Sequence, residues 1–428
     1  MLRYCSLSLK SSQALNFSIL TRNKEKSLYC DYMDKLNLRD LPLKGKRVLM
    51  RVDFNVPLTK EGTISDDSRI RAALHSIAYV LEHGASLVLM SHLGKPKGKA
   101  DAAFSLAPCA KRLSELLEKP VAFAPDCVGP EVGRMVEKLE AGRVLLLENL
   151  RFHKGEEKPE EDPAFARALA GWGDVYVNDA FGTAHRAHAS TAAVAGFFPG
   201  KAAMGFLMEE EIRWLFPLLH NPKRPFFAIL GGAKVSTKVG VIESLLKKVD
   251  ALYLGGGMVY TFLQAKGQKV GESLVEEDKV ATAKKLFCEK IRFPLDLVIA
   301  DGGTNEAKKK VIAISDAIPD GWRGMDIGPK TVGQWGKELS QAATVFWNGP
   351  LGVFEMPSFA AGTRGIAESL ARAPGKVIVG GGDSVAAIEQ MGFGQSFAHL
   401  STGGGASLEY LEFGHLPGID ALSNKPAN

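Results

Sequence analysis

The sequence predicts an α/β protein of two doubly wound, Rossmann-like parallel-sheet domains, joined by an interdomain helix with a hinge. Three observations support this prediction. The chain has 428 residues, which is too long for one ordinary hydrophobic core. Short apolar runs alternate with segments of helical periodicity, as in parallel sheets that are covered on both faces. The same alternation starts again after Pro225.

The first half of the chain alternates strand-like and helix-like segments. Within Ser68–His83 the apolar residues recur at helical spacing, and Gly84 follows where such a helix would end. The predicted strands are Val48–Phe54, Ser86–Ser91, Val121–Ala124, Val144–Glu148 and Val175–Asp179, and the predicted helices are Ser68–His83, Leu106–Glu118 and Glu131–Leu139.

The second half repeats this pattern and defines the expected domain boundaries. Its predicted strands are Phe226–Leu230, Ala251–Leu254, Asp296–Ile299, Ala343–Trp347 and Lys376–Val379. Between the two sets, the apolar positions of Phe206–Leu219 suit one helix that joins two domains. We expect an N-terminal extension at 1–32, domains at 33–205 and 220–408, the joining helix at 206–219, and a C-terminal segment at 409–428 that returns to the first domain.

Composition excludes several classes of protein. With 46% hydrophobic and 24% charged residues the chain is globular, and no unbroken apolar run is long enough to span a membrane. The five cysteines are scattered and form no Cys-x-x-Cys pair, which fits a reducing compartment and argues against a zinc cluster or a disulfide framework. Of the net charge of +5, residues 1–32 carry +3, from five basic and two acidic residues. The near-neutral remainder gives no indication of nucleic-acid binding.

Residues 1–32 differ from the rest of the chain. They are basic, rich in Ser and poor in acidic residues, and they lack the long apolar stretch of a secretory signal. Three interpretations stay open: a transit peptide, a disordered tail, or an upstream start codon with Met33 as the true first residue. Because the regular pattern begins at Met33, we favour the second or third and expect a cytoplasmic protein; a transit peptide would direct it to an organelle.

The two halves differ in the residues that follow their strands. In the first half the strands lead into Arg, His and Asn, and in the second half into glycines, as at Gly231–Gly232, Gly255–Gly257 and Gly380–Gly382. Ligands of open parallel sheets bind at the carboxyl ends of the strands. We therefore expect one site rich in cations and another whose bare backbone a flat or phosphorylated ligand can approach.

The cation-rich site of the first half is predicted from four separate loops, which carry Arg69, His92, Arg151 and Arg186. One basic loop is typical of a solvated turn, but four at equivalent positions indicate an anion pocket. The planar fork of Arg suits phosphate and carboxylate, because it donates two hydrogen bonds at once. The two histidines that flank Arg186 could also suggest a metal, but zinc would need more convergent ligands.

The strand that leads into this site carries a second signal. Arg51, Asp53 and Asn55 alternate with apolar residues, so we expect all three on one face of a strand that Pro57 ends. A half-exposed strand would give the same pattern. The apolar neighbours instead favour a buried strand whose polar face meets a ligand.

In the second half, Lys234 and Lys238 follow Gly231–Gly232 at a predicted strand-to-helix turn. Their spacing of four predicts a shared helix face. A solvated pair is the simpler alternative, but backbone N–H groups at such glycines are suited to phosphate. Asp383 follows Gly380–Gly382 at the start of another predicted helix, where it would either cap the helix or hold Mg²⁺.

Other classes of nucleotide enzyme leave no signature in this sequence. It contains no P-loop motif, no G-x-G-x-x-G after a strand, and neither His-Arg-Asp nor Asp-Phe-Gly, which argues against dehydrogenases and protein kinases. A non-catalytic binding protein with two lobes stays open as an alternative. It would share the basic loops but has no need to keep Lys234, Lys238 and Asp383 together.

Eight sequence blocks, taken together, closely resemble the phosphoglycerate kinase family. The resemblance runs from about Met33 to the C-terminus. Each block alone is weakly specific, whereas eight in the right order are very specific. The blocks are Arg51–Pro57, Ser91–Pro96, Leu147–His153, Asn178–His188, Gly231–Lys238, Asn348–Glu355, Gly380–Ser384 and Thr402–Ser407.

The resemblance implies a monomeric, hinge-bending enzyme of glycolysis and gluconeogenesis. It would transfer a phosphoryl group reversibly, with Mg²⁺, between ATP and the carboxylate of 3-phosphoglycerate, giving ADP and 1,3-bisphosphoglycerate. The implied 3-phosphoglycerate ligands are Asp53, Asn55, Arg69, His92, Arg151 and Arg186. The implied nucleotide ligands are Lys234, Lys238, Gly256, Gly257, Asn348, Glu355, Asp383 and Ser384, with Asp383 also the metal ligand. The implied catalytic residues are Arg69, Lys234, Lys238, Gly381 and Gly382.

This reaction fits the residue types. The attacking carboxylate is ionised at neutral pH, with a reference pKa of roughly 3–4, so no general base and no covalent intermediate are expected. The obstacle is repulsion between anions, which alignment and cations overcome. Because the two ligands bind different domains, transfer requires closure about a hinge near 206–219.

Three residues depart from the commonest family pattern. Lys95 replaces an Arg, so a bidentate contact becomes a point charge, and we leave Lys95 out of the predicted site. Thr237 replaces an Asp, and Ser384 replaces a Thr. Both residues carry a hydroxyl, and we expect little effect from either.

Overall fold

The computed structural model describes residue 32 and residues 34–426. The predicted extension, apart from Tyr32, lies outside these residues, as does Met33. The described residues group into two compact units. The first comprises residues up to Asp179, His188–Phe206 and the segment from Gly418 onward, and the second comprises Ala180–Ala187 and Leu207–Pro417. None of the described helices is both long and apolar enough to cross a membrane.

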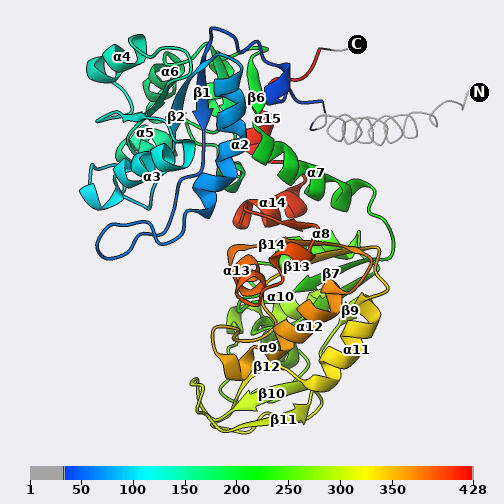
Figure 1. Ribbon diagram of the computed structural model, residues 1–428. Helices are drawn as coiled ribbons and strands as arrows, with labels where there is room; N and C mark the ends of the chain where they lie inside the picture. Colours follow the sequence, from blue (N-terminus) through cyan, green and yellow to red (C-terminus); the bar gives the residue numbers. More distant parts are fainter. Residues whose placement is uncertain (1–31, 33, 427–428) are drawn as a thin grey trace, which may run out of the picture. The chain divides into compact units, whose positions relative to one another are not determined.

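The first unit is built on a parallel sheet, as predicted. In the described chain its six strands lie in the order β3-β4-β2-β1-β5-β6. Figure 1 labels β1, β2 and β6 of this sheet. The strands are β1 (Arg47–Arg51), β2 (Ser86–Met90), β3 (Val121–Phe123), β4 (Val144–Leu146), β5 (Val175–Asn178) and β6 (Ala202–Met204). The helices are α2 (Ser68–Glu82), α3 (Ala107–Leu117), α4 (Pro130–Glu137), α5 (Lys154–Glu157) and α6 (Pro163–Ala170).

One face of this sheet is covered by α2 and α3. Ile70 and Ile77 of α2 and Leu113 of α3 share a buried apolar cluster with Val48 and Met50 of β1. The apolar positions of α2 recur at helical spacing, so they lie along the face that meets the sheet. The helix ends at Glu82 with His83 as its C-cap, and Gly84 follows with a φ of 74°, at the place where the sequence predicted the end of the helix.

The first strand ends earlier than predicted. The sequence predicts a strand through Phe54, but β1 ends at Arg51. Beyond it the backbone bonds change partner: Val52 N still donates to Met90 O at 3.1 Å, whereas Phe54 N donates to the Ser91 hydroxyl at 2.8 Å. A side chain thus replaces the sheet ladder, and the expectation of Asp53 and Asn55 on a strand face was wrong.

The second unit contains a second parallel sheet. In the described chain its six strands lie in the order β15-β14-β13-β7-β8-β9. They are β7 (Phe226–Leu230), β8 (Ala251–Leu254), β9 (Ile291–Arg292), β13 (Thr344–Asn348), β14 (Lys376–Gly380) and β15 (His399–Leu400). The helices are α7 (Phe206–His220), α8 (Val239–Leu246), α9 (Met258–Ala265), α10 (Val280–Leu286), α11 (Pro329–Leu339), α12 (Ala361–Ala371), α13 (Gly382–Gln390) and α14 (Gly405–Phe413). All of α15 (Pro417–Asp420) except Pro417 belongs to the first unit.

Alternate strand residues divide this sheet into two buried faces. Ile229, Val345 and Val379 pack with Trp335 of α11 and Ile366 of α12 in one apolar cluster. The strands read as continuous apolar runs because both faces of the sheet are covered. α7, whose first residue Phe206 groups with the first unit and whose remainder groups with the second, agrees with the predicted helix at 206–219.

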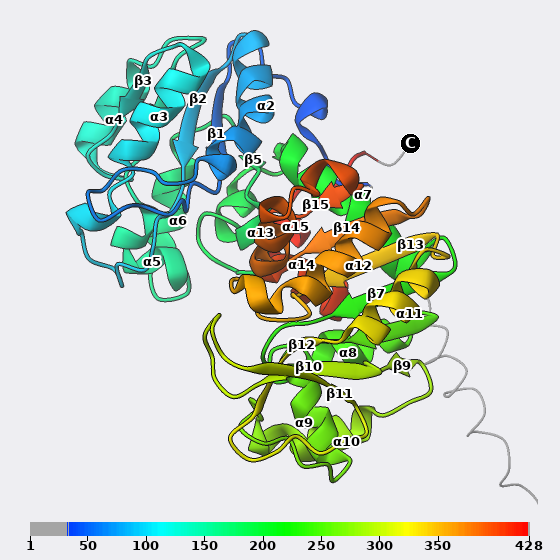
Figure 2. The same cartoon turned by 60° about the horizontal axis from the view of Figure 1, so that its bottom comes forward.

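A separate antiparallel sheet was not predicted. The segment Asp296–Ile299 is a strand, as expected, but β10 (Asp296–Ala300) does not join the parallel sheet. It pairs with β11 (Lys309–Ala313) and β12 (Arg323–Ile327), and Figure 2 shows these strands apart from β7, β13 and β14. β11 is mostly exposed and rich in Lys, so its apolar pattern was too weak to predict.

Short 3-10 helices and the end of the chain complete the fold. The 3-10 helices are Leu38–Asp40, Ala102–Phe104, Leu150–Phe152, Phe181–Thr183, Ala193–Phe197, Glu277–Lys279, Pro357–Phe359 and Gly394–Ser396. In the first unit, Ser423 N donates to Ala202 O of β6 at 2.9 Å, and Leu36 N donates to Ser423 O at 2.8 Å. The last described residues therefore belong to the first unit. Which ligand each unit binds remains a prediction.

Candidate active site

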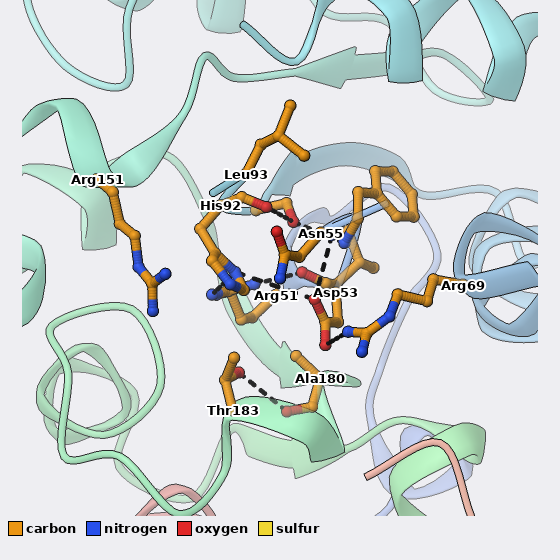
Figure 3. Close-up of polar contacts among 12 residues, drawn as sticks. Arg51, Asp53, Asn55, Arg69, His92, Leu93, Arg151, Ala180 and Thr183 are labelled. Atoms are coloured by element: carbon orange, nitrogen blue, oxygen red, sulfur yellow. Dashed lines mark hydrogen bonds and ion pairs between the residues drawn. The ribbon is translucent and has the colours of Figure 1, made fainter. Parts of the chain in front are cut away.

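Five of the predicted anion ligands lie together at the carboxyl ends of neighbouring strands (Figure 3). Asp53 and Asn55 follow β1, His92 follows β2, Arg151 follows β4, and Arg69 comes from the first turn of α2. Because β4, β2 and β1 are adjacent in the sheet, their ends meet at one edge. We call Asp53, Asn55, Arg69, His92 and Arg151 the basic crest.

Asp53 connects two cationic or polar side chains of the basic crest. Its Oδ2 forms an ion pair with Arg69 Nη1, and its Oδ1 lies 4.0 Å from His92 Nδ1. The Arg69 side chain is 36% exposed and the Asp53 side chain 13%. Ion pairs with such exposure contribute only about 0–1 kcal/mol, so an incoming anion can compete with Asp53 for Arg69.

The loop after His92 is fixed from two sides. Asn55 Oδ1 accepts a hydrogen bond from Gly94 N at 2.9 Å, and Arg151 Nη1 donates to Gly94 O at 2.7 Å. Arg151 is only 4% exposed, and its Nε lies 3.1 Å from Glu157 Oε1. These bonds place Arg151 and Asn55 beside His92, whereas Lys95, which the sequence prediction left out, is exposed.

Arg186 belongs to the second unit by its contacts. Its Nε donates to His185 Nε2 at 3.2 Å. Its charge also lowers the pKa of Glu409, which burial raises overall. Its place among the 3-phosphoglycerate ligands stays a prediction.

Metal-capable side chains gather elsewhere in the first unit. Among the described residues, one group of three or more has ligand atoms within 4.8 Å of one another: Asp126, Cys127 and His153. Burial and nearby carboxylates raise the pKa of the Cys127 thiol well above its usual value, and its Sγ lies 3.0 Å from Glu148 O. His153 Nε2 lies 2.5 Å from Asp126 Oδ1. These mutual bonds account for the cluster, and His185 and His188 are not in it.

The second unit has a hollow of about 440 Å³ at the carboxyl ends of its parallel strands. Four predicted nucleotide ligands line it, Gly256, Gly257, Glu355 and Asp383. The sequence prediction missed several other lining residues, among them Tyr260, Arg323, Met325 and Leu351. Tyr260 lies in an apolar helix, and Arg323 and Met325 lie on the unpredicted antiparallel sheet, so no motif pointed to them. Leu351 lies within the block Asn348–Glu355 but was not singled out as a ligand.

Glycine is required where the backbone segments of this hollow meet. Gly256 has a φ of +65°, and a Cβ at this position would lie 2.5 Å from Gly232 N. A side chain would therefore clash with backbone and strain the local conformation. Gly381 has a φ of +94°, and its Cβ would lie 2.5 Å from Asn348 Nδ2. We call Gly232, Gly256, Gly257, Gly381 and Gly382 the glycine crest.

Lys238 is the buried cation beside the glycine crest. It is 8% exposed, and its Nζ donates to Gly231 O and to Asn348 Oδ1, both at 2.6 Å. Lys234, by contrast, is exposed. The predicted shared helix face was wrong, because α8 begins at Val239 and Lys238 is its N-cap. The turn Val235–Lys238, closed by Lys238 N donating to Val235 O at 2.8 Å, precedes the helix.

Asn348 and Ser384 hold the segments around Lys238. Asn348 Nδ2 donates to Gly380 O at 2.7 Å, while its Oδ1 accepts from Lys238. Ser384 Oγ accepts from Gly349 N at 2.5 Å. Both side chains are buried. Asn348 thus joins the ends of β13 and β14, and the hydroxyl of Ser384 joins the first turn of α13 to the residue after β13.

Asp383 lies at the amino end of α13, on the rim of the hollow. Gly381 is the N-cap and Asp383 is in the first turn, and no side chain caps this helix. The exposed carboxylate is thus not used as a cap, which was the alternative that the sequence left open. Helix amino ends favour negative phosphoryl groups.

Burial lowers the pKa of Lys238 to about 8, and Asp383 partly opposes this shift. Below about pH 8, Lys238 is protonated in both the folded and the unfolded chain. The full cost of burying its charge then lowers the free energy of unfolding. Between about 8 and the ordinary value of 10.5 only the unfolded chain keeps the proton, so the free energy of unfolding rises with pH.

We expect this rise to reach about 2–3 kcal/mol between pH 8 and 10. It is measured as the difference between wild type and Lys238→Met in urea unfolding without ligand. A difference that stays constant with pH would show that Lys238 titrates normally.

A buried acid under the hollow was not predicted. Asp326 of β12 accepts hydrogen bonds from Gly362 N at 2.7 Å and Ile327 N at 2.9 Å. Burial raises its pKa to about 7, and these two backbone bonds oppose the shift. A Cβ on Gly352, which lines the hollow, would lie 2.2 Å from Asp326 Oδ1. Asp326 therefore packs directly against the segment Pro350–Val353 at Gly352.

A larger hollow of about 820 Å³ lies on the first unit, between residues 62–67 and α3. No residue of the basic crest lines it. Three of its charged residues pair with one another, because Arg112 binds both Asp67 and Glu115. We therefore assign it no ligand.

Comparison with known proteins identifies relatives over nearly the whole chain. A sequence model described as phosphoglycerate kinase matches residues 38–414. Phosphoglycerate kinase of Moorella thermoacetica is 55% identical over 399 residues, which are 92% of this chain and 100% of that protein. The enzyme of Chloroflexus aurantiacus is 54% identical over 403 residues, with the same coverage of 92% and 100%.

Solved structures of the same name share the fold. Phosphoglycerate kinase from Coxiella burnetii superposes with a TM-score of 0.81 at 40% identity, covering 90% of this chain and 98% of that one. The structure from Pyrococcus horikoshii gives a TM-score of 0.79 at 33% identity, covering 90% and 98%.

Proposed function

The chain belongs to the phosphoglycerate kinase family, a phosphotransferase of glycolysis, and we propose that its basic crest binds 3-phosphoglycerate while its glycine crest binds Mg-ATP. The observation that carries this proposal is that charged side chains gather at the edge of one sheet, whereas glycines gather at the edge of the other. At one edge, Arg69 and His92 lie beside Asp53, and Arg151 holds the loop after His92. At the other edge, glycine backbone and Asp383 line a hollow, and the buried Lys238 donates to Gly231 O beside it.

The basic crest matches the groups of 3-phosphoglycerate. This substrate carries a phosphate, a carboxylate and a hydroxyl. Arg69, Arg151 and His92 supply donors for its anionic groups, and the Asp53 carboxylate can accept a hydrogen bond from its hydroxyl. Arg186, predicted for the same ligand, belongs to this proposal on the sequence resemblance alone.

The glycine crest matches a nucleotide. The bare backbone at Gly256 and Gly257 admits a flat base, Glu355 is available to ribose hydroxyls, and the amino end of α13 faces phosphate. Lys234 is exposed at the same edge, so a flexible cation can reach the phosphates. We propose that Asn348 and Ser384 hold this edge in shape through Lys238 and Gly349.

Asp383 fits a magnesium ion bound together with the nucleotide. It offers an exposed carboxylate, and Mg²⁺ is held by one or two carboxylates together with phosphate oxygens and water. Bound there, the ion would neutralise phosphate charge. Asp383 would hold it on the phosphate side of the hollow.

The transfer itself needs no general base. The acceptor carboxylate is already ionised, so the residues align two anions and offset their repulsion. We propose that Lys238 and Arg69 supply the cations at the moving phosphoryl group, with backbone N–H groups at Gly381 and Gly382 beside it. Direct transfer without a covalent intermediate requires that the two ligands meet, which is the function of a hinge near 206–219.

The partition of ligands between the two crests is tested by calorimetry on two variants. We expect Arg151→Met to weaken 3-phosphoglycerate about tenfold or more, because a charged hydrogen bond is lost, and to leave Mg-ADP unchanged. Asp383→Asn should weaken Mg-ADP similarly and leave 3-phosphoglycerate unchanged. Weaker Mg-ADP binding by Arg151→Met would contradict the assignment of the basic crest. Weaker 3-phosphoglycerate binding by Asp383→Asn would contradict the assignment of the glycine crest.

We propose further that the enzyme is a cytoplasmic monomer. The scattered cysteines, of which Cys109 and Cys127 are buried and free, fit a reducing compartment. Light scattering of the purified chain tests the monomer. Mass spectrometry of the native protein distinguishes a start at Met1, a start at Met33 and cleavage of a transit peptide.

A further inference from the structure

Arg51 is a buried cation directly behind the basic crest, and the predicted ligand set does not contain it. It is the last residue of β1 and is 1% exposed. Its Nε donates to Ser190 Oγ at 2.8 Å, its Nη1 donates to Val52 O, and its Nη2 lies 3.1 Å from His92 Nδ1 (Figure 3). The guanidinium is therefore held at three points.

The contact between Arg51 and His92 determines where the imidazole carries its proton. A guanidinium has donors only and does not lose its proton in proteins. His92 Nδ1 must therefore be the acceptor, which leaves the ring neutral with its proton on Nε2. The alternative, Nδ1–H donating to Asp53 Oδ1, would span 4.0 Å and is too long for a hydrogen bond.

A second layer holds Arg51 in place. Ser190 Oγ accepts from Arg51 and donates to Glu156 Oε1 at 2.7 Å, and Ser190 N donates to Glu156 Oε2 at 3.0 Å. Glu156 is 0% exposed. Burial raises the pKa of Glu156, and Arg51 is the largest influence that lowers it. Arg51 and Glu156 thus compensate each other's charge across the Ser190 hydroxyl.

We propose that Arg51 is a positioning residue that locks His92 in the Nε2–H tautomer, with Ser190 and Glu156 holding Arg51. This inference rests on the proposed binding of 3-phosphoglycerate by His92. The lock makes Nε2 a permanent donor toward an anion. Without it both neutral tautomers are available, and the Nδ1–H form would present a lone pair at Nε2, which repels phosphate and carboxylate.

The tautomer is read directly by nitrogen-15 NMR of the full chain labelled at histidine, at a pH where the ring is neutral. His92→Gln identifies the signals. We expect an N–H type nitrogen at Nε2 and a lone-pair type nitrogen at Nδ1 in the ligand-free enzyme. An Nδ1–H ring, a mixture of tautomers, or a doubly protonated ring would overturn the proposal.

The influence of Arg51 is tested with Arg51→Met. We expect His92 to become a mixture of tautomers and the KM for 3-phosphoglycerate to rise about tenfold, with kcat and the KM for Mg-ATP within about threefold of wild type. The matched control is Arg47→Met, at the opposite end of the same strand, which should change neither the tautomer nor KM. If Arg51→Met alone fails to fold, Arg51→Met/Glu156→Gln removes both buried charges and serves instead.

The outcomes separate this inference from the proposed function. If the Nε2–H form of His92 persists in Arg51→Met, Arg51 does not set the tautomer, whatever value the KM for 3-phosphoglycerate takes. If the tautomer changes while the KM for 3-phosphoglycerate does not, Arg51 does set the tautomer, but His92 does not bind the substrate through Nε2. That second result overturns the substrate part of the proposal and counts against the basic crest as its site.

Discussion

Replacing Lys238 with Ala is expected to lower kcat about a thousandfold while changing the dissociation constant of Mg-ADP by less than about fivefold. Lys238 is held by Gly231 O and Asn348 Oδ1, both at 2.6 Å. In the absence of ligand its charge is bound by backbone and amide oxygens rather than by a carboxylate. The cation is thus kept ready for the extra charge of the transition state, and its loss should affect the rate more than nucleotide binding.

The measurement combines steady-state kinetics with calorimetric titration of Mg-ADP. Lys247→Ala is the matched control, because Lys247 is the C-cap at the other end of α8 and is exposed. Circular dichroism and a melting curve show whether each variant is folded. A folded Lys238→Ala enzyme with kcat within about twofold of wild type would remove Lys238 from the proposed mechanism.

Replacing Arg69 with Met is expected to lower kcat/KM for 3-phosphoglycerate by at least about a hundredfold. Arg69 is the more exposed of the two arginines of the basic crest, and its ion pair with Asp53 is weak enough to be exchanged for a substrate anion. Arg69 can therefore leave Asp53 and pair with the substrate anion while the carboxylate attacks. Arg69→Lys keeps the charge but loses the planar fork, and we expect an intermediate loss.

The control for Arg69 lies on the same helix. Arg71 of α2 pairs with Asp67 at 2.9 Å and is 54% exposed, so Arg71→Met should stay within about twofold of wild type. Mg-ADP binding should be unaffected in both variants. An Arg69→Met enzyme that loses nucleotide affinity but not turnover would place Arg69 outside the acceptor site.

The sequence predicted the scaffold of the site well, because the buried strands of parallel sheets appear in the sequence as continuous apolar runs. Continuous apolar runs located β1, β2, β4, β7, β8, β13 and β14, and the residues that follow them are those of the two crests. Gly256 and Gly381 were placed in the site by the family resemblance, and their ligand roles stay predictions. In the structure both have a positive φ, and a Cβ at either position would lie too close to a neighbouring segment.

The sequence predicted less well wherever tertiary contacts replace local patterns. β1 ends at Arg51 because the hydroxyl of Ser91 takes the N–H of Phe54, a bond between segments that are distant in sequence. Lys234 and Lys238 are separated by a turn that spacing alone cannot distinguish from a helix. β10 and its partners were missed as a sheet because their antiparallel pairing depends on exposed, Lys-rich β11.

The supporting residues behind the crests were the least predictable. Glu156 lies in a charged stretch that reads as solvated, yet it is fully buried against Ser190. Asp326 is one acid in a short strand, and its function depends on Gly352 and Gly362 folding over it. Nothing local marks such residues, because their partners are assembled only by the complete fold.

Phosphoryl transfer from Mg-ATP to 3-phosphoglycerate is the activity of the family to which this chain belongs. It is tested by measuring ADP formation with and without 3-phosphoglycerate, with the acyl phosphate product coupled to NADH oxidation by glyceraldehyde-3-phosphate dehydrogenase. We expect ADP formation that depends on 3-phosphoglycerate, with matching NADH oxidation. Folded protein that binds Mg-ADP but gives neither signal would contradict it and favour a two-lobed binding protein.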